Sequence, residues 1–333
     1  MVWTLDPSLV RDAAARLAPL AGRTPLRRSA ALSAHAGAEV WLKLETEQTG
    51  GSFKIRGAIN VVATLSPAER DAGIVASSAG NHGTGLALAA RAAGVAVTLF
   101  VPHDAPAVKQ AKMRAAGAQL DTSGRDYDDA ERLAMAHAAA TGRRFVSPCT
   151  GTMLVAGQGT VGLEIAEQCP AVRTVVVCVG GGGLVGGIGG WFRATSPGVR
   201  IVGAQSDQTT AMAASLAAGR RVDVAVPPTL ADGLAGQIDD DGFAMGRAVL
   251  DDMALVTEAE LAAAIAWLWH EEGIRAEGAG AVAVAALLAG RVPHASGPVV
   301  ATVSGGNIDP ERHARVVAAA SAAGTASRAT RYE

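Results

Sequence analysis

Apolar positions along the first half of the chain change repeatedly between the spacing of a strand and that of a helix. Residues 74–77 form a short apolar run, and residues 95–101 alternate apolar with polar positions, as strands do. Between them, residues 81–93 repeat apolar positions at helical spacing and stop at Gly94. The same order then continues, with a helix expected over 107–116, a strand over 118–122, a helix over 126–141 and a strand over 144–147. These patterns predict a compact parallel α/β unit.

The second half of the chain predicts another α/β unit, with strands over 174–179, 199–204 and 298–303. The uncharged stretch 174–192 is long enough to raise the question of a membrane span. Its crowded glycines instead favour a buried strand, a tight loop and a closely packed helix. Thr257 and Glu260 match a capping box ahead of a scaffold helix, and residues 321–333 are expected to form a frayed tail.

Composition narrows the functional classes. The 333 residues, 49% of them hydrophobic, can form one large or two ordinary domains. A formal net charge of -2 gives no electrostatic footprint for nucleic acid or an acidic membrane, so neither partner is expected. The start of the chain lacks a secretory signal pattern, and three cysteines without metal-ligand spacing argue against a disulfide framework and a zinc site. Both observations favour the reducing cytoplasm.

Four unusual segments lie where ligands bind in open parallel sheets, next to strand ends or helix starts. They contain a lysine between small residues and an aromatic, a serine-rich turn with Asn81 and His82, four consecutive glycines, and a Ser-Gly-Gly-Asn run. Together they predict one composite pocket. The segments are Gly50–Ala58, Ser77–Gly83, Gly180–Leu184 and Ser304–Asn307.

The tetraglycine loop Gly180–Gly183 has three possible interpretations on its own. Its bare amides and the following helix suit a phosphate. Gly181, Gly183 and Gly186 also spell GxGxxG, with Asp207 at the distance that a dinucleotide site requires, and plain packing glycines remain a third reading. Lys54 is the context that distinguishes them. Most lysines are solvated surface charges, but a partly buried lysine among small residues can form a covalent bond to an electrophile.

Seven motifs in order resemble the serine/threonine dehydratases, pyridoxal-phosphate enzymes of fold type II that are related to serine racemase. The combination is far more specific than any single motif, and the resemblance covers roughly residues 20 to 318. The motifs are Gly51–Ala58, Ser78–His82, Gly157–Thr160, Gly180–Gly183, Ala231–Gly233, Glu277–Ala281 and Ser304–Asn307.

The resemblance implies a two-domain α/β fold, similar to the tryptophan synthase β subunit, in which each domain is an open, mostly parallel sheet flanked by helices. Residues 1–72 and 150–333 would form the large cofactor-binding domain, and residues 73–149 a small domain inserted in it. A homodimer is also implied by the resemblance alone.

The implied cofactor is pyridoxal 5'-phosphate, bound covalently by the amine of Lys54. Phe53 would cover a ring face, the tetraglycine loop with Leu184 would bind the phosphate, and Asn81 would hydrogen-bond the ring hydroxyl. Ser304 would contact the pyridine nitrogen as a neutral hydroxyl, which tempers the electron sink and suits elimination. Glu277 would frame the ring edge or support Ser304, with a salt-bridged structural role as the alternative. The implied cofactor residues are Phe53, Lys54, Asn81, Gly180, Gly181, Gly182, Gly183, Leu184, Glu277 and Ser304.

The implied reaction is β-elimination of water from a 3-hydroxy amino acid of the L-threonine or L-serine type, giving a 2-oxo acid and ammonia. Lys54 would also be the base at Cα. Ser78, Ala79 and His82 would border the substrate carboxylate at a helix N-terminus. Orientation is the expected role of His82, with direct proton transfer as the alternative. Arg56 is expected to form a scaffold ion pair.

Departures from the family pattern qualify these expectations. Serine racemase has a second base directly before Gly-Asn-His, where this chain has Ala79, so efficient two-base racemisation is not expected. Gln205 and Ala211 stand where some relatives have acidic metal ligands, and Asp207 alone cannot rebuild that site, so no essential metal is predicted there. The unusual segment Pro148–Thr152 is expected to border the pocket.

Alternatives remain at this stage. Within the same fold they are a dehydratase for another substrate such as 3-hydroxyaspartate, a β-replacement synthase and a racemase. Outside it they are a nicotinamide-dependent oxidoreductase that uses Asp207, and a binding protein without turnover. The motifs leave the preferred side chain and its stereochemistry open.

Overall fold

Two mostly parallel sheets organise the protein. The structure is a computed structural model that describes residues 3–293 and 297–329. The larger sheet has the strand order β1-β2-β10-β7-β8-β9, and the smaller sheet has the order β5-β4-β3-β6. β1 is antiparallel to β2, and the other pairs in both sheets are parallel. The larger sheet consists of β1 Leu26–Ser29, β2 Val40–Leu44, β7 Thr174–Cys178, β8 Arg200–Ser206, β9 Asp252–Val256 and β10 Val299–Val303. The smaller sheet consists of β3 Ile74–Ser77, β4 Val97–Pro102, β5 Gln119–Gly124 and β6 Arg144–Phe145.

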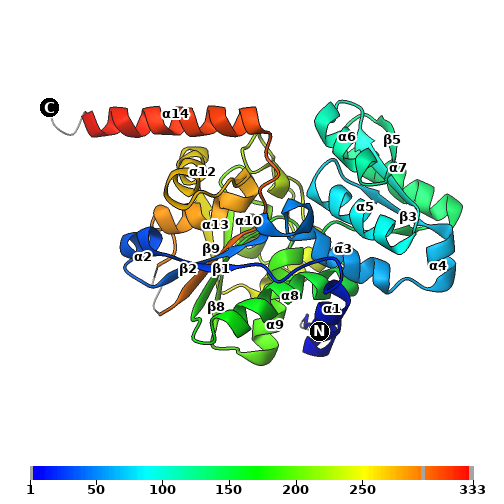
Figure 1. Ribbon diagram of the computed structural model, residues 1–333, viewed down its shortest axis with the longest axis horizontal. Helices are drawn as coiled ribbons and strands as arrows, with labels where there is room; N and C mark the ends of the chain where they lie inside the picture. Colours follow the sequence, from blue (N-terminus) through cyan, green and yellow to red (C-terminus); the bar gives the residue numbers. More distant parts are fainter. Residues whose placement is uncertain (1–2, 294–296, 330–333) are drawn as a thin grey trace.

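Helices flank the two sheets, which lie on opposite sides of the molecule in Figure 1. The first seven helices are α1 Pro7–Leu17, α2 Ala30–Ala36, α3 Lys54–Ala63, α4 Pro67–Ala72, α5 Asn81–Ala93, α6 Ala107–Ala115 and α7 Tyr127–Thr141. The others are α8 Thr152–Gln168, α9 Gly183–Thr195, α10 Ala211–Ala218, α11 Asp240–Val249, α12 Glu258–Glu272, α13 Gly278–Leu288 and α14 Pro310–Ala329. Within the described residues, short 3-10 turns occur at Glu45–Glu47, Thr49–Gly51 and Asp232–Leu234.

The helix α3 joins the two halves of the fold, because it packs against α5 beside the smaller sheet and against α8 beside the larger one (Figure 1). Both crossings depend on glycine. A Cβ on Gly157 of α8 would lie 2.6 Å from the Cα of Gly57 on α3. A Cβ on Gly85 of α5 would lie 3.1 Å from the backbone nitrogen of Ile55. The helices therefore approach one another at backbone distance.

The predicted α/β class is confirmed, and so are most predicted elements. The central strand β7 is buried along its whole length, which explains why its sequence is continuously apolar rather than alternating. Helix α5 ends at Gly94, which has the left-handed conformation that favours glycine, and the capping box of Thr257 and Glu260 is present. All strands of the smaller sheet come from residues 74–145. The division into domains at 73 and 149 stays a prediction.

Several predicted element ends differ from the structure: β4 begins at Val97 rather than Val95, β5 ends at Gly124 rather than Thr122, and β8 ends at Ser206 rather than Ala204. Two further differences have a clear physical reason. Strand β6 stops at Phe145, because the hydroxyl of Ser147 accepts hydrogen bonds from the backbone amides of Cys149 and Thr150 and turns the chain. The expected frayed tail is helical from Ser321 to Ala329, where α14 projects from the body (Figure 1). Its frequent alanines favour helix over coil. Residues 330–333 of that predicted tail lie outside the described residues.

Candidate active site

Lys54 is the first residue of α3, and the loop before it is tied to the end of β10. The backbone amide of Phe53 donates to the carbonyl oxygen of Ser304 at 3.1 Å, and Ser52 forms an antiparallel bridge with Gly305. Gly51, with φ of 76°, accepts a hydrogen bond from the amide of Gly306. These contacts bring the lysine motif and the Ser-Gly-Gly-Asn motif together, as the predicted composite pocket requires.

The amine of Lys54 faces the unusual segment that begins at Pro148. Its Nζ donates to the carbonyl oxygen of Pro148 at 2.7 Å and lies 5.2 Å from the centroid of the Phe53 ring. The side chain is half-buried. An amine in this position is within reach of a ligand, and a backbone carbonyl orients it. The expectation that Pro148–Thr152 borders the pocket agrees with this contact.

The tetraglycine loop connects β7 to α9 and lies against Cys149. A Cβ on Gly181 would lie 2.5 Å from the Cys149 Sγ, and one on Gly183 would lie 2.5 Å from its carbonyl oxygen. Gly182 has φ of 96°, and α9 begins at Gly183 without a side-chain cap. Its first-turn amides are therefore available to an anion, which the positive end of the helix also attracts. The Leu184 side chain belongs to the hydrophobic core, so only its backbone could serve the predicted phosphate site.

Asn81 is the first residue of α5, and its side chain reaches Glu277 at the start of α13. The Nδ2 of Asn81 donates to Oε1 of Glu277 at 2.6 Å. Burial raises the pKa of Glu277 to about 7, the negative charge of Asp232 adds to the rise, and the Asn81 hydrogen bond opposes it. Among the residues that the structure describes, Glu277 has no ion-pair partner within 4.0 Å and accepts the hydrogen bond from Asn81 instead, so both roles predicted for it stay predictions.

Ser304 follows β10 and is buried, with one long contact of 3.4 Å from its Oγ to the carbonyl oxygen of Ala279. The thiol of Cys178, the last residue of β7, also lies against this hydroxyl. Burial raises the pKa of Cys178 to about 11, and the hydrogen bond with Ser304 acts in the opposite direction. The thiol is therefore neutral at physiological pH. Sequence reasoning missed this neighbour, since an apolar strand gives no sign of what its last side chain touches.

Ser78, Ala79 and His82 lie at the N-terminus of α5, as predicted. The hydroxyl of Ser78 accepts hydrogen bonds from the amides of Gly80 and Gly83, so it caps the turn. His82 is buried, with Nε2 at 3.2 Å from the carbonyl oxygen of Val146 and with Nδ1 lacking a partner among the described residues. Burial, and then the positive charge of Lys54, lower the pKa of His82 to about 3. A neutral ring that donates from Nε2 favours the orienting role.

Arg56 forms the expected scaffold ion pair. Its guanidinium is 2.7 Å from Oε2 of Glu45 and 2.6 Å from Oε1 of Glu164, and Lys43 approaches the other oxygen of Glu164 at 2.5 Å. Two cations and two carboxylates thus neutralise one another beneath α3. Since Arg56 is two residues from Lys54, this buried network fixes the helix that carries the lysine.

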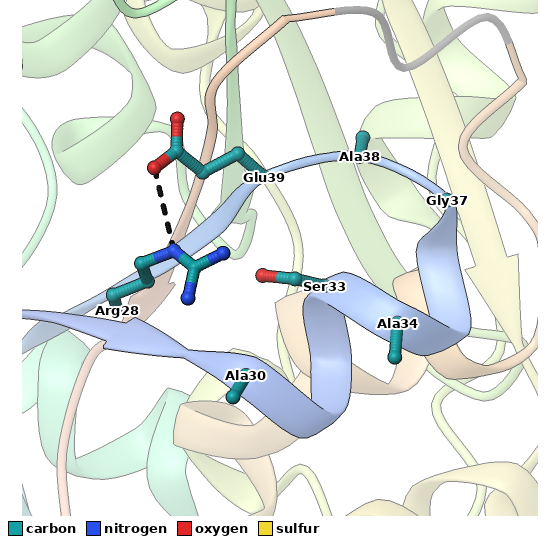
Figure 2. A pocket seen from close by; sticks show the side chains of 7 residues that line it. All are labelled: Arg28, Ala30, Ser33, Ala34, Gly37, Ala38 and Glu39. Carbon is teal, nitrogen blue, oxygen red and sulfur yellow. Dashed lines mark ion pairs between the residues drawn. The ribbon is translucent and has the colours of Figure 1, made fainter.

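A surface hollow elsewhere on the protein lacks the predicted site residues. The hollow in Figure 2, about 430 Å³, lies over β1 and α2, where its Arg28 and Glu39 pair with each other at 3.4 Å and none of the predicted site residues line it. The described part of the chain contains no cluster of three potential metal-ligating side chains. Across that same part, no helix combines the length and the apolar character needed to span a bilayer.

The residues of this site fit pyridoxal phosphate. The start of α9 at Gly183 has no side-chain cap and suits the phosphate, and Gly181 and Gly183 are bare because a Cβ there would meet Cys149. Lys54 offers an amine for the aldehyde, and Asn81 and Ser304 offer donors for the ring hydroxyl and the pyridine nitrogen. Phe53 lies beside the amine. We propose these roles for the residues, and they rest on this geometry together with the family resemblance.

Comparisons with known proteins agree on one family. The profile described as "Pyridoxal-phosphate dependent enzyme" matches residues 17–305. The L-threonine ammonia-lyase of Thermotoga maritima is 42% identical over 309 residues, which is 92% of this chain and 77% of that protein. The structure of maize serine racemase has a TM-score of 0.89 with 31% identity, over 93% of this chain and 96% of that one. Processed threonine deaminase isoform 2 from Solanum lycopersicum has a TM-score of 0.87 with 30% identity, over 95% and 96% of the two chains.

These matches cover most of the chain, and they favour a pyridoxal-phosphate enzyme over a nicotinamide-dependent one, while the role of the tetraglycine loop as the phosphate site stays a proposal. The chain belongs to the pyridoxal-phosphate dependent enzymes, has the fold type II architecture and uses pyridoxal 5'-phosphate as its cofactor.

Proposed function

We propose that this enzyme is an ammonia-lyase that converts L-threonine to a 2-oxo acid and ammonia, by elimination of water and hydrolysis of the product that elimination leaves. The observation that carries the proposal is the pairing of Lys54, whose amine lies at the site, with Ala79, whose methyl group can transfer no proton. One base on one face of the substrate suits elimination, whereas two-base racemisation needs a second. The L-threonine ammonia-lyase relative supports the choice of substrate.

Bound pyridoxal phosphate supplies the electron sink that makes the substrate Cα–H acidic. The chain contributes position and protonation. Lys54 removes the Cα proton, and the carbonyl of Pro148 directs its amine. The neutral hydroxyl of Ser304 would contact the pyridine nitrogen without adding a charge. The amides at the start of α5 that the Ser78 hydroxyl does not use would receive the substrate carboxylate. The substrate loses its Cα proton and its hydroxyl as water. One water molecule then adds to the C=N carbon of the released product, so its nitrogen leaves as ammonia and the net products are one 2-oxo acid and one ammonia.

The decisive experiment incubates purified holoenzyme with L-threonine, L-serine and 3-hydroxyaspartate and measures 2-oxo acid and ammonia. L-Threonine should give both products in equal amounts. Lys54→Ala should reduce turnover by at least about 10³-fold and abolish borohydride trapping of the cofactor on the protein. Absence of both products with L-threonine would reject the proposed function, and absence with every 3-hydroxy amino acid would reject the reaction class as well. An arm with added thiol tests the β-replacement alternative.

Narrower expectations belong to the same proposal. We propose L-serine as a second substrate, a homodimer as the assembly and the cytoplasm as the location. The three cysteines are free in the structure, which supports a reducing compartment. Light scattering of the purified enzyme tests the dimer.

A further inference from the structure

A chain of side-chain hydrogen bonds leads from α6 to Asn81. The ammonium of Lys112 donates to Oδ1 of Asn307 at 2.6 Å. The Nδ2 of Asn307 donates to Oδ1 of Asn81 at 2.8 Å and to the carbonyl oxygen of Gly50 at 2.7 Å. Asn81 in turn donates from Nδ2 to Glu277. The chain joins α6 and α5, beside the smaller sheet, to the loop after β10 and the start of α13.

The chemistry of each group fixes the direction of this chain. An ammonium can only donate and a backbone carbonyl can only accept, so Lys112 and Gly50 together determine which end of the Asn307 amide is oxygen. The nitrogen of Asn307 then faces Asn81 and requires an oxygen there. Asn81 must therefore direct its own nitrogen towards Glu277. Glu277 alone would not enforce this orientation, because a carboxyl with a pKa of about 7 can accept or donate near neutral pH.

The orientation of Asn81 matters for the cofactor. An amide nitrogen has two hydrogens, and Glu277 uses one of them. The second can be offered to the ionised ring hydroxyl of the cofactor. If the amide were reversed, its carbonyl oxygen would meet that negatively charged oxygen and repel it.

We propose that Asn307 is a positioning residue that holds the Asn81 amide with its nitrogen towards the cofactor, and that Lys112 anchors Asn307 from α6. The inference rests on the proposed role of Asn81 as ligand of the ring hydroxyl. A close fit supports it, since a Cβ on Gly51 would lie 2.7 Å from Oδ1 of Asn307. The amide of Asn307 therefore occupies a place shaped by the lysine loop.

Two substitutions separate positioning from a structural role. Asn307→Asp keeps the shape and the contact with Lys112 but places an acceptor against Asn81, which reverses the Asn81 amide. Asn307→Ser removes the contacts and imposes no orientation. The dissociation constant of pyridoxal phosphate should rise about tenfold in Asn307→Asp and about threefold in Asn307→Ser. A structural role predicts the opposite order, because aspartate is the closer mimic.

A charge effect is tested in the same measurement. The added carboxylate could repel the cofactor through space, but salt would then screen much of the deficit. The deficit of Asn307→Asp should persist between 0.05 M and 0.5 M salt, values chosen to shorten the screening length severalfold. A reversed Asn81 also favours the protonated form of Glu277, so the pH dependence of the cofactor absorbance should move to higher pH. Asp232, Lys109 and Lys112 also act on Glu277 and are unchanged in this variant.

Two lysines on α6 give a matched pair. Lys112 contacts Asn307, whereas Lys109 pairs with Asp232 at 3.5 Å. Lys112→Met should weaken cofactor binding about threefold and Lys109→Met by less than about twofold, because only the first loses the anchor. The inference would be overturned if Lys112→Met and Lys109→Met weakened cofactor binding equally. It would also be overturned if Asn307→Ser bound the cofactor more weakly than Asn307→Asp. Failure of the wild-type enzyme to act on threonine would reject the proposed function instead, and the binding order would still be measurable.

Discussion

The side chain of Cys149 packs directly against Gly181 of the tetraglycine loop. A Cβ on Gly181 would lie 2.5 Å from the Sγ of Cys149 and 2.7 Å from its Cβ. Gly181→Ala should therefore push the two segments apart and weaken pyridoxal-phosphate binding by about tenfold, an overpacking effect. Titration of the apoenzyme with cofactor, followed by absorbance, measures this change. Gly198→Ala is the control, because beyond the adjacent residues of the chain nothing lies within 4 Å of the position of its Cβ.

The same contact can be tested by rescue. Cys149→Gly removes both atoms that the new Cβ would meet, so the double variant Gly181→Ala with Cys149→Gly should bind the cofactor more tightly than Gly181→Ala alone. Strict additivity of the two single effects would show that the contact is not the cause.

Arg56 should be worth far more to stability than an exposed arginine. Arg56→Met leaves the buried carboxylates of Glu45 and Glu164 with Lys43 as their remaining cation, and should cost about 3–5 kcal/mol in the free energy of unfolding. Arg23→Met, which breaks an exposed pair with Glu167 at 2.9 Å, should cost about 1 kcal/mol or less. Urea unfolding of the apoenzyme compares them. Similar losses for both variants would contradict the role of the buried network.

Glu277 should make the apoenzyme less stable as the pH rises. Its pKa is about 7 in the folded protein, above its ordinary value of 4.5, so between these values the folded state binds more protons than the unfolded state. The unfavourable contribution therefore grows from about pH 4.5 to 7 and stays constant above, at up to about 3 kcal/mol. Unfolding free energies of wild type and Glu277→Gln, measured across this range, should diverge with increasing pH. Parallel curves would refute the shift.

His82 should have the opposite effect at acid pH. Its pKa is about 3 in the folded protein, below its ordinary value of 6.5, so the unfolded state takes up a proton first. The stability that it contributes is complete above about pH 6.5 and is lost towards pH 3, by up to about 1.4 kcal/mol per pH unit. His82→Gln should remove this dependence relative to wild type. Because His82 and Glu277 act in opposite directions between pH 4.5 and 6.5, only the differences between variant and wild type isolate each residue.

The sequence predicts best those helices whose ends are marked by a local signal, such as a C-terminal glycine or a capping box. Gly94 ends α5 and the Thr257 capping box begins α12, and both signals depend on neighbouring residues only. The turn at Ser147 shortened a predicted strand through one hydroxyl that accepts from two amides, and no periodicity reveals such a contact. Helix α14 shows the reverse case, in which polar composition obscured the helix propensity of alanine.

The candidate site divides in the same way. Lys54, Asn81, the tetraglycine loop and Ser304 were predicted because their motifs resemble a known family. Lys112 and Cys178 were missed, since their relevance comes from the side chains that they touch across the fold. Asn307 was part of a motif, but its partners come from three separate segments, and only the folded chain brings them together.

The position of Lys54 depends on the glycines at which α3 crosses α5 and α8. Gly57, Gly85 and Gly157 are not among the predicted cofactor or catalytic residues, yet a methyl group at any of them would tilt or shift the helix that begins with Lys54. Random mutagenesis screened for soluble but inactive variants should therefore recover replacements of these three glycines. For an engineer, these three positions belong with the active site, although they lie outside it.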